Sequence, residues 1–393
     1  MDRVPHRHRN HNRGQLTTGT AVTILRYMLR PLGWGVAGLL IGAFCIGYAA
    51  PYLPPSHFWW ANLLAVLLPP LGLAVGLLGL GLLGYGVYRR AWGRVVIAGA
   101  LLALLALRFA PRGGGWSASA AGVETVRLMT FNVPMSFARQ DASARALEQF
   151  VQRKAPDVLA LQESWVTTEL APASGRGSRP WPPRAFLKDA LGYTLPRARP
   201  VRTTLCQPVL GRLALDSLSV HTLPPGGDTS RCSRYTRTRF AWQDRPAVLY
   251  NLHLHTIGSV RPWEVMEDWG SLDRWRAFLR SYRIATLRRA EQARLIRRRI
   301  EQETHPVLVV GDFNSTPHQW AYRHIAQGLQ RADPQGRWGR GATFPARRPL
   351  VRIDHVLAGP AWDVVATGIP VPEGDTAISD HRSVTAHLRW SGD

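Results

Sequence analysis

Cysteine, lysine and acidic residues are scarce in this sequence. Its three cysteines form no CxxC pair, which leaves no spacing typical of a zinc site. Lysine occurs only at Lys154 and Lys188, so the basic surplus consists almost entirely of arginine. Residues 1–122 hold 11 arginines and one acid, and residues 123–393 hold 38 basic and 25 acidic residues. This surplus favours an anionic partner such as nucleic acid or lipid headgroups, but it identifies no chemistry.

The few cysteines leave two interpretations open. Cys45 lies within an apolar stretch, whereas Cys206 and Cys232 lie in the polar part of the chain. The latter pair is compatible with one disulfide, which would require an oxidising compartment. It is equally compatible with two unrelated thiols.

Charge is absent from three apolar runs. Residues 32–50 and 58–88 contain no charged side chain, although Pro69 and Pro70 interrupt the second run, and residues 95–107 form a shorter run that flanking residues extend. Because about 20 apolar residues cross the hydrocarbon core of a bilayer, the sequence predicts transmembrane helices at about 32–50, 59–88 and 92–110. A cleaved signal peptide is the alternative for the first run, but its basic leader is long and further apolar runs follow.

The placement of arginine predicts an orientation. Residues 1–31 form a basic tail, and Arg89, Arg90 and Arg94 lie between the second and third runs, whereas the first connection, PYLPPSH, has no fixed charge. The positive-inside rule then puts the N-terminus in the cytoplasm and, after three crossings, the rest of the chain outside it. We expect a multi-pass cell-membrane protein with a linker at 111–122 and an extracytoplasmic domain at 123–393. If the third run does not span, the domain is cytoplasmic.

In the polar domain, segments typical of strands end in polar side chains. We expect strands at 124–133, 157–164, 247–256, 306–314, 350–359 and 379–390, with helices at 143–156 and 273–303. The polar residues within or beside the ends of these strands are Asn132, Glu163, His253, Asp312, Asn314, Asp354, Asp380 and His381. Any one of them is an ordinary turn or structural residue. A sheet whose strand ends converge would gather all of them in one cleft.

The segments TFNV, LQES, NLHLH, GDFNSTP, RIDHV and SDH follow one another in this order. With them the chain resembles the endonuclease/exonuclease/phosphatase superfamily, which includes deoxyribonuclease I, exonuclease III and neutral sphingomyelinases. The resemblance covers roughly residues 124–390. It implies an α+β fold, a four-layer α/β/β/α sandwich of the deoxyribonuclease I type, here preceded by three transmembrane helices, with the site at one edge of the sandwich.

The resemblance also implies roles for these residues. Glu163 would bind a divalent cation, Mg²⁺ or Mn²⁺, with help from Asn132, while Asp380 would bind a second metal or support its turn. Asp312 would accept the proton of the attacking water, and Asn314 would orient the phosphate. His381 would contact the phosphate with its tautomer fixed by Asp354, and His253 would contact the phosphate or act as general acid. His255 and His355 match no catalytic position, and we expect both to be structural.

These observations predict a membrane-anchored, metal-dependent phosphoester hydrolase. Its partners would be the lipid bilayer and a phosphoester substrate, either nucleic acid or phospholipid; no protein partner and no cofactor besides the metal follow from the sequence. A lipid phosphodiesterase of the sphingomyelinase type and a non-catalytic membrane-anchored binding module are the alternatives. Residues 273–303 form a basic amphipathic helix. The nearby Trp263, Trp269 and Trp275 would either dip into a bilayer surface or form a small core of their own.

Overall fold

The computed structural model describes residues 18–109, 124–138, 140–164, 166–167, 191–199, 204–224, 234–258, 262–334, 341–374 and 376–392. The predicted linker at 111–122 and the first part of the basic tail lie outside these residues. Among the cysteines, Cys45 is free and Cys206 is disulfide-bonded, while Cys232 lies outside the described part of the chain.

The N-terminal region is helical. Its elements are α1 (Thr18–Ala49), the short 3₁₀ turn η1 (Ala50–Tyr52), α2 (Pro55–Phe58), α3 (Ala61–Val66), α4 (Leu68–Tyr88) and α5 (Trp92–Phe109). Three stretches in helices α1, α4 and α5 are long enough and apolar enough to cross a membrane, namely Pro31–Tyr52, Leu68–Tyr88 and Trp92–Phe109. The prediction of one helix over 59–88 is wrong, because the chain between Ala50 and Leu67 folds into short elements before α4 begins.

The polar domain contains two large sheets. The five-stranded sheet has the order β13 (Trp362–Gly368), β14 (Val384–Trp390), β1 (Val126–Asn132), β2 (Val158–Gln162) and β6 (Val209–Gly211). The seven-stranded sheet has the order β11 (Gln330–Arg331), β12 (Asp354–Ala358), β10 (Val307–Asp312), β9 (Arg245–His253), β8 (Arg234–Trp242), β7 (Leu215–Thr222) and β4 (Arg197–Arg199). A small separate pair joins β3 (Val166–Thr167) to β5 (Thr204–Leu205).

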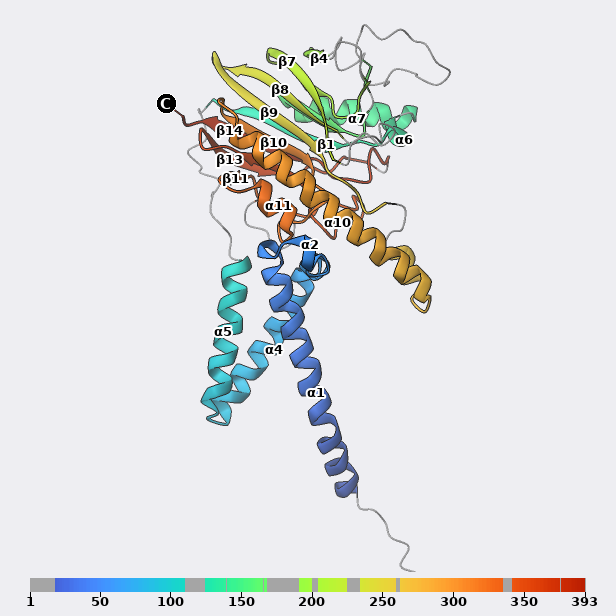
Figure 1. Ribbon diagram of the computed structural model, residues 1–393, viewed down its shortest axis with the longest axis vertical. Coiled ribbons are helices and arrows are strands. Elements are labelled where there is room, and N and C mark those ends of the chain that lie inside the picture. Colours follow the sequence, from blue (N-terminus) through green and yellow to red (C-terminus); the bar gives the residue numbers. More distant parts are fainter. Residues whose placement is uncertain are drawn as a thin grey trace, which may run out of the picture.

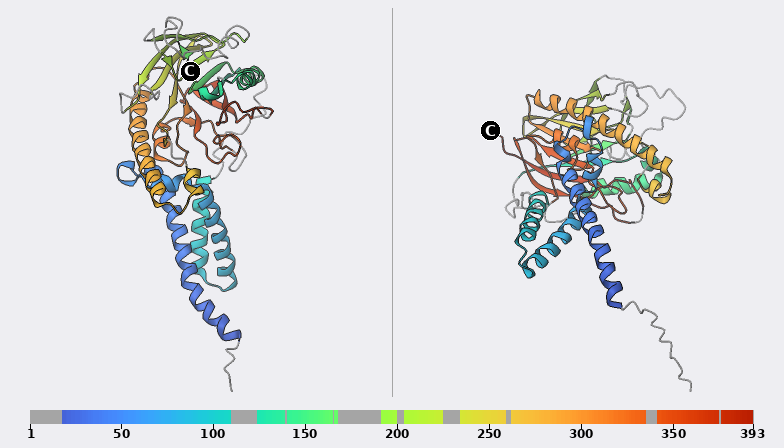
Figure 2. Two further views of the ribbon diagram at one scale, coloured as in Figure 1. Left: turned by 90° about the vertical axis from the view of Figure 1, so that its right-hand side faces the viewer. Right: turned by 60° about the horizontal axis from the view of Figure 1, so that its bottom comes forward.

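In its described part the polar domain also has five helices, and the longer ones cover the outer faces of these sheets (Figures 1 and 2). The five helices are α6 (Met135–Ala138), α7 (Asp141–Lys154), α9 (Pro262–Glu267), α10 (Leu272–Glu301) and α11 (Trp320–Ile325). Helix α7 packs Leu147 and Phe150 onto the outer side of β1 and β2. Helices α10 and α11 pack Ile296 and Ile325 onto the outer side of β9 and β10. Together with the two facing sheets they confirm the predicted α/β/β/α sandwich.

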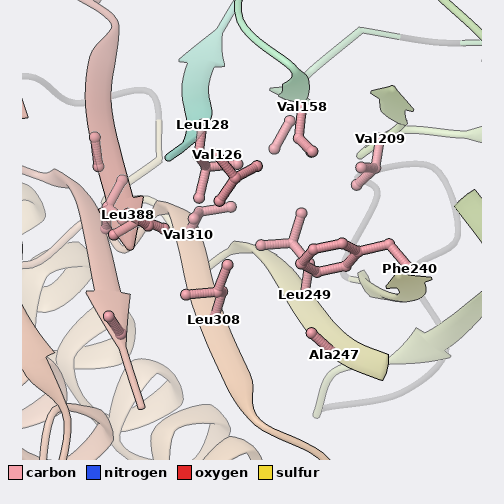
Figure 3. Packing of buried hydrophobic residues seen from close by; sticks show 14 of the residues in the cluster. Val126, Leu128, Val158, Val209, Phe240, Ala247, Leu249, Leu308, Val310 and Leu388 are labelled. Atoms are coloured by element: carbon pink, nitrogen blue, oxygen red, sulfur yellow. The ribbon is translucent and has the colours of Figure 1, made fainter. Parts of the chain in front are cut away.

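Side-chain alternation along the strands explains the layers. On β10, Leu308 and Val310 enter the core between the sheets, where they meet Leu128 of β1 (Figure 3). Val307 and Val309 point the other way, toward the helices. Because side chains of a strand alternate between its faces, a continuous apolar run such as VLVV marks a strand that is buried on both sides.

The segment between α1 and α4, residues 50–67, packs against the polar domain; we call it the connecting segment. Its Asn62 is 2% exposed, and the side-chain oxygen accepts a hydrogen bond of 3.0 Å from the backbone N–H of Trp320. Gln319 donates to the backbone oxygen of Asn62 at 3.3 Å and to the Tyr282 hydroxyl on α10 at 2.9 Å. Leu63 joins the apolar cluster around Tyr282. The polar domain therefore sits directly on the end of the helical bundle.

We expect Asn62→Ala to destabilise the full chain by about 1–3 kcal/mol, because the N–H of Trp320 loses its buried acceptor. Thermal unfolding in detergent micelles would measure this. Gln302→Ala, which removes an exposed carboxamide at the end of α10, is the matched control and should leave the midpoint unchanged. Equal midpoints for Asn62→Ala and the wild type would show that this contact contributes nothing to stability.

Candidate active site

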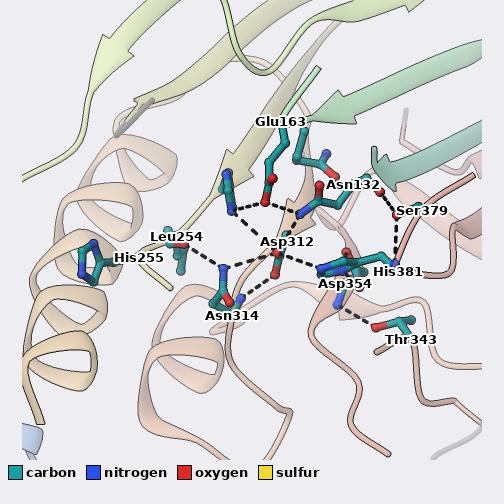
Figure 4. A network of polar contacts seen from close by, with 12 residues as sticks. Asn132, Glu163, Leu254, His255, Asp312, Asn314, Thr343, Asp354, Ser379 and His381 are labelled. Carbon is teal, nitrogen blue, oxygen red and sulfur yellow. Dashed lines mark hydrogen bonds and ion pairs between the residues drawn. The ribbon is translucent and has the colours of Figure 1, made fainter. Parts of the chain in front are cut away.

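The strand ends with polar side chains meet at one edge of the sandwich. In the five-stranded sheet, β1 ends at Asn132, and Glu163 follows the end of the neighbouring strand β2. In the seven-stranded sheet, Asp312 at the end of β10 pairs in register with His253 of β9 on one side and Asp354 of β12 on the other. Figure 4 shows that Asn132, Glu163, Asp312, Asp354 and His381 point toward one another. One network thus gathers residues that are up to 249 positions apart in the sequence, from Asn132 to His381.

Asp312 lies at the centre of this network and is 1% exposed. Its carboxylate accepts hydrogen bonds from Asn132 Nδ2 at 3.1 Å, from the backbone N–H of Asn314 at 2.8 Å and from Asn314 Nδ2 at 3.3 Å. Burial raises the pKa of Asp312 to about 6, and the nearby carboxylate of Asp354 contributes to the rise. At neutral pH Asp312 is therefore ionised, yet it binds a proton more tightly than an ordinary aspartate, as a general base should.

The backbone around Asp312 depends on glycine and asparagine. Gly311 has a φ of +128°, and a Cβ at this position would lie 2.0 Å from the backbone oxygen of Leu252, so a larger residue cannot be accommodated. Asn314 has a φ of 47°, in the left-handed region that asparagine tolerates better than most residues. Its side chain also donates to the backbone oxygen of Leu254 at 2.9 Å. These constraints fix the Asn314 amide beside the carboxylate of Asp312.

His381 forms a buried pair with Asp354. The Nδ1 atom lies 3.0 Å and 3.2 Å from the two carboxylate oxygens of Asp354, and Nε2 lies 3.9 Å from Oδ2 of Asp312. Burial lowers the pKa of His381, but the charge and the hydrogen bond of Asp354, with Asp312 and Asp380, raise it to about 10. This raised pKa favours the protonated imidazole, whose orientation Asp354 fixes through Nδ1.

Glu163 and His253 occupy the opposite side of Asp312. Oε1 of Glu163 accepts a hydrogen bond of 3.1 Å from Asn132 Nδ2 and lies 3.6 Å from Nε2 of His253, which is itself 3.7 Å from Oδ2 of Asp312. The Glu163 side chain is 40% exposed, so it presents a carboxylate at the rim above the buried Asp312. Its φ of 56° is unusual for glutamate and costs about 1–2 kcal/mol, a strain typical of functional sites.

Several buried oxygen atoms at or beside this network lack a hydrogen-bond partner among the described residues. Two of them belong to residues expected to bind a metal, namely Oδ1 of Asn132 and Oδ1 of Asp380, which precedes His381. A buried acceptor without a partner is costly, and carboxylate and amide oxygens are the ligands preferred by Mg²⁺. Asn132 and the accessible carboxylate of Glu163, which are hydrogen-bonded to each other, therefore offer oxygens of the kind that a hard divalent cation prefers.

A second group of potential metal ligands includes the hydrogen-bonded pair of His381 and Asp354. One ligand atom from each of Asp312, Asp354 and His381 lies within 4.8 Å of the others. In its protonated form His381 offers no lone pair to a metal, so a cation bound among these three residues would have to displace the proton of His381.

The histidines expected to be structural lie outside this network. His355 is fully buried, and its Nε2 contacts the backbone oxygen of Ser315 at 2.9 Å. Burial lowers the pKa of His355 well below its ordinary value, so the ring is neutral and donates this hydrogen bond. His255 is fixed through its backbone, because its N–H donates to Gln292 and its oxygen accepts from Arg289, both on α10.

Comparison with protein families agrees with this geometry. The model of the endonuclease/exonuclease/phosphatase family matches residues 129–381, from β1 to His381. The chain belongs to the endonuclease/exonuclease/phosphatase family. Members of this family are phosphoester hydrolases and generally use divalent metals.

Several solved structures are similar to this chain. An endonuclease/exonuclease/phosphatase protein of Beutenbergia cavernae is 23% identical, with 68% of this chain and 72% of that chain covered and a TM-score of 0.45. D. rerio TDP2 in complex with a single-strand DNA product is 15% identical, with 68% and 99% covered and a TM-score of 0.47. Mannosyl-6-phosphatase of Bacteroides thetaiotaomicron is 17% identical, with 67% and 100% covered and a TM-score of 0.45. A search of curated proteins found no match.

In this member of the endonuclease/exonuclease/phosphatase family, several supporting residues had no role assigned from the sequence, although Gln162 and Ser379 lie within the motifs LQES and SDH. Gln162 donates across the sandwich to Asn251 at 2.7 Å and thereby joins β2 to β9 just before Glu163 and His253. Ser379 donates to the backbone oxygen of Asn132 at 2.5 Å and accepts from the backbone N–H of His381 at 2.9 Å. Ser and Gln are too common to stand out in a sequence; only their proximity to motif residues could have pointed to them.

Proposed function

We propose that this protein is a membrane-anchored, divalent-metal-dependent phosphoester hydrolase in which water attacks phosphorus. The observation that carries the proposal is the position of Asp312. This buried carboxylate of raised pKa lies between a protonated imidazole, His381, and an accessible carboxylate, Glu163, at one edge of the sandwich. Hydrolysis of a phosphoester requires a base for the attacking water, a positive charge beside the phosphoryl oxygens and a metal site rich in oxygen ligands. Asp312, the His381 imidazolium and Glu163 would supply these three parts next to one another.

Each protein group has a task in this scheme. Asp312 accepts the proton of the attacking water, and the Asn314 amide fixes the carboxylate and orients the phosphate. His381 presents its positive charge to the phosphoryl oxygens, and Asp354 holds the ring in place through Nδ1. His253, whose Nε2 faces both Glu163 and Asp312, contacts the phosphate or donates a proton to the leaving oxygen.

Glu163, Asn132 and Asp380 are the residues that would hold the cation, which we assign as Mg²⁺, with Mn²⁺ as a substitute. When bound, such an ion polarises the phosphoryl oxygen and stabilises negative charge in the transition state. The unpartnered oxygens of Asn132 and Asp380 support this assignment.

The helical region supports an anchored domain outside the cytoplasm. The connecting segment contacts the polar domain, so the junction of α1 and α4 lies on the same side as this domain, and the turn between α4 and α5 lies at the far end (Figure 1). Arg89, Arg90 and Arg94 at that turn favour the cytoplasm, and the disulfide-bonded Cys206 fits an oxidising compartment. A phosphatase reporter that is active only outside the cytoplasm, fused after residue 393, should be active; a silent reporter would reject this orientation.

Nucleic acid and phospholipid are the two substrate classes that we propose. One observation favours a lipid phosphodiester. The loop after Asp312 is tied to the bundle, because Gln319 accepts from the backbone N–H of Thr316 and donates to the backbone oxygen of Asn62, so the site is close to the membrane end of the domain. A non-catalytic binding module finds no support, because Asp312 and His381 are both present and linked in one network.

Turnover of bis(p-nitrophenyl) phosphate by the full chain in detergent tests the proposal. We expect hydrolysis with Mg²⁺ and none after treatment with a chelator, because the transition-state charge then lacks its cation. Plasmid DNA and sphingomyelin vesicles, offered to the same preparation, separate the two substrate classes. Hydrolysis that persists in excess chelator would refute metal dependence, and no turnover of any substrate would refute the enzyme.

A further inference from the structure

The polar domain exposes an unusual group of apolar side chains at the start of α10. Met266, Trp269 and Leu272 are 69%, 80% and 70% exposed. Within the described part of the polar domain, the other exposed large apolar residues are Ile284, Leu350 and Val371, so half of the set falls within seven positions. A concentrated apolar patch of this kind marks a contact surface. We call residues 262–276, from α9 into the first turn of α10, the helical tip.

The helical tip is an ordered segment, held by a helix cap, an ion pair and a side-chain hydrogen bond, with its exposed apolar residues on the surface. Ser271 caps α10 by accepting from the backbone N–H of Arg274, whose guanidinium lies 3.2 Å from a carboxylate oxygen of Asp268. Trp275 Nε1 donates to the backbone oxygen of Trp269 at 2.9 Å. The Trp275 ring packs edge-on against Phe278, in the underlying apolar cluster. Of the tryptophans considered in the sequence, Trp275 thus belongs to a small core, whereas Trp269 projects into the surroundings.

The position of the helical tip identifies what it contacts. The cluster beneath it, which includes Val265 and Phe278, also takes in Trp59 and Leu63 of the connecting segment. The patch is therefore continuous with the end of the helical bundle. In Figures 1 and 2 the start of α10 lies at the level of the ends of α4 and α5 that face the polar domain. A bilayer around these apolar helices has its headgroup layer at this level.

The arginines that follow the helical tip fit such a layer, and Asp268 and Asp273 of the tip itself are paired with Arg274 and Arg276. Arg280 and Arg283 are exposed on the turns that follow the helical tip, and neither has an ion-pair partner within the described part of the chain. Tryptophan favours the membrane–water interface, and arginine beside it binds lipid phosphates. The combination is typical of an interfacial membrane contact, whereas a protein partner would not require the patch to lie at the end of the bundle.

We propose that the helical tip lies in the headgroup layer of the membrane that α1, α4 and α5 cross, with Met266, Trp269 and Leu272 inserted and Arg280 and Arg283 on lipid phosphates. This inference rests on the membrane anchoring proposed above. It gives the domain a second attachment besides the bundle.

The second attachment fixes how the site faces the bilayer. Helix α10 runs from the helical tip to the site, where Gln292 and Arg289 hold the backbone of His255. The preceding residue, Leu254, accepts from the Asn314 amide. Helix α10 therefore links the helical tip to the backbone beside the site, and immersion of the tip holds the site at a constant height above the lipid.

A fluorescent label tests this placement. In a Cys45→Ala background, Trp269→Cys carries an environment-sensitive fluorophore, and the full chain is reconstituted in vesicles of phosphatidylcholine and phosphatidylglycerol. Asp244→Cys is the control, because it lies in the turn between β8 and β9, at the opposite end of β9 from His253. The background protein without an added cysteine gives the unspecific labelling.

We expect quenching by doxyl-labelled lipid to be several-fold stronger at position 269 than at 244, and quenching by aqueous iodide to be several-fold weaker. In Met266→Ser/Leu272→Ser the label at 269 should move toward the behaviour of position 244. If the protein floats with the vesicles and resists alkaline extraction but iodide quenches both positions equally, the placement of the helical tip is wrong and the membrane anchoring still stands. Protein that does not float with the vesicles would overturn the anchoring and the inference with it.

Discussion

Asp312→Ala is expected to reduce the hydrolysis of bis(p-nitrophenyl) phosphate by about 10³-fold, the usual contribution of a positioned general base. The wild-type rate should also fall as the pH drops through about 6, because protonation of Asp312 removes the base. Steady-state kinetics between acidic and neutral pH measure both effects. In the variant, this acid limb should disappear from the residual rate.

The fold should survive this change. The pKa of Asp312 is raised in the folded state, which means that protonated Asp312 stabilises the fold relative to ionised Asp312. This stabilisation is fully present below the ordinary aspartate pKa and is lost as the pH rises through about 6. At neutral pH ionised Asp312 therefore stabilises the fold less than protonated Asp312 would. Asp312→Ala removes this ionised group but also the acceptor for Asn132 and Asn314, so we expect a modest fall in the unfolding temperature with the native fold retained. Asp363→Ala, which removes an exposed carboxylate that pairs with Arg389, is the control and should retain activity. Wild-type turnover in Asp312→Ala would defeat the assignment of the base.

The site residues were predictable because their signals are local. The run VLVV followed by Gly311 marks a buried strand that stops at Asp312, and the structure ends β10 at that residue. The reason for the proximity of Asp312 and Asn314 was not predictable in the same way. Persistent strand geometry would have put both side chains on one face, but the chain leaves the strand, and the left-handed backbone of Asn314 brings its amide to the carboxylate.

Elements that depend on distant partners were missed. Strand β8 has the sequence RYTRTRFAW. Its three arginines are not typical of a strand that is buried on one face, so the sequence did not predict it. Arg237 is accommodated because Glu303, after the end of α10, binds its guanidinium at 2.5 Å and 2.8 Å. A charge that is neutralised by a residue 66 positions away leaves no sign in the local sequence.

The wrong bounds of the second apolar helix have a similar cause. Hydropathy measures how apolar a segment is, but it does not distinguish a lipid-facing helix from a segment that packs against protein. Residues 59–67 are apolar because Trp59 and Leu63 cover the cluster around Phe278 of the polar domain. The single polar residue among them, Asn62, is the one that bonds the polar domain.

Glu163→Gln is expected to raise the Mg²⁺ concentration for half-maximal activity by about 100-fold or more. Mutation of residues that only hydrogen-bond a metal ligand already lowers metal affinity by about 10- to 100-fold, and loss of a ligand should cost at least as much. The substitution keeps the size of the side chain and an oxygen that can accept from Asn132 Nδ2, but it removes the negative charge from a carboxylate that we assign to the cation and that is 40% exposed. A titration of turnover against Mg²⁺ in chelator-treated protein measures the shift.

The comparison with Asp312→Ala separates a metal ligand from a base. Excess Mg²⁺ should restore part of the activity of Glu163→Gln, because Asn132 and Asp380 still offer oxygens, whereas no concentration of metal should restore Asp312→Ala. Glu291→Gln makes the same change at an exposed position of α10 and should titrate like the wild type. If Glu163→Gln required no more Mg²⁺ than this control, the cation would have to be held elsewhere, and the buried group of Asp312, Asp354 and His381 would become the site to test next.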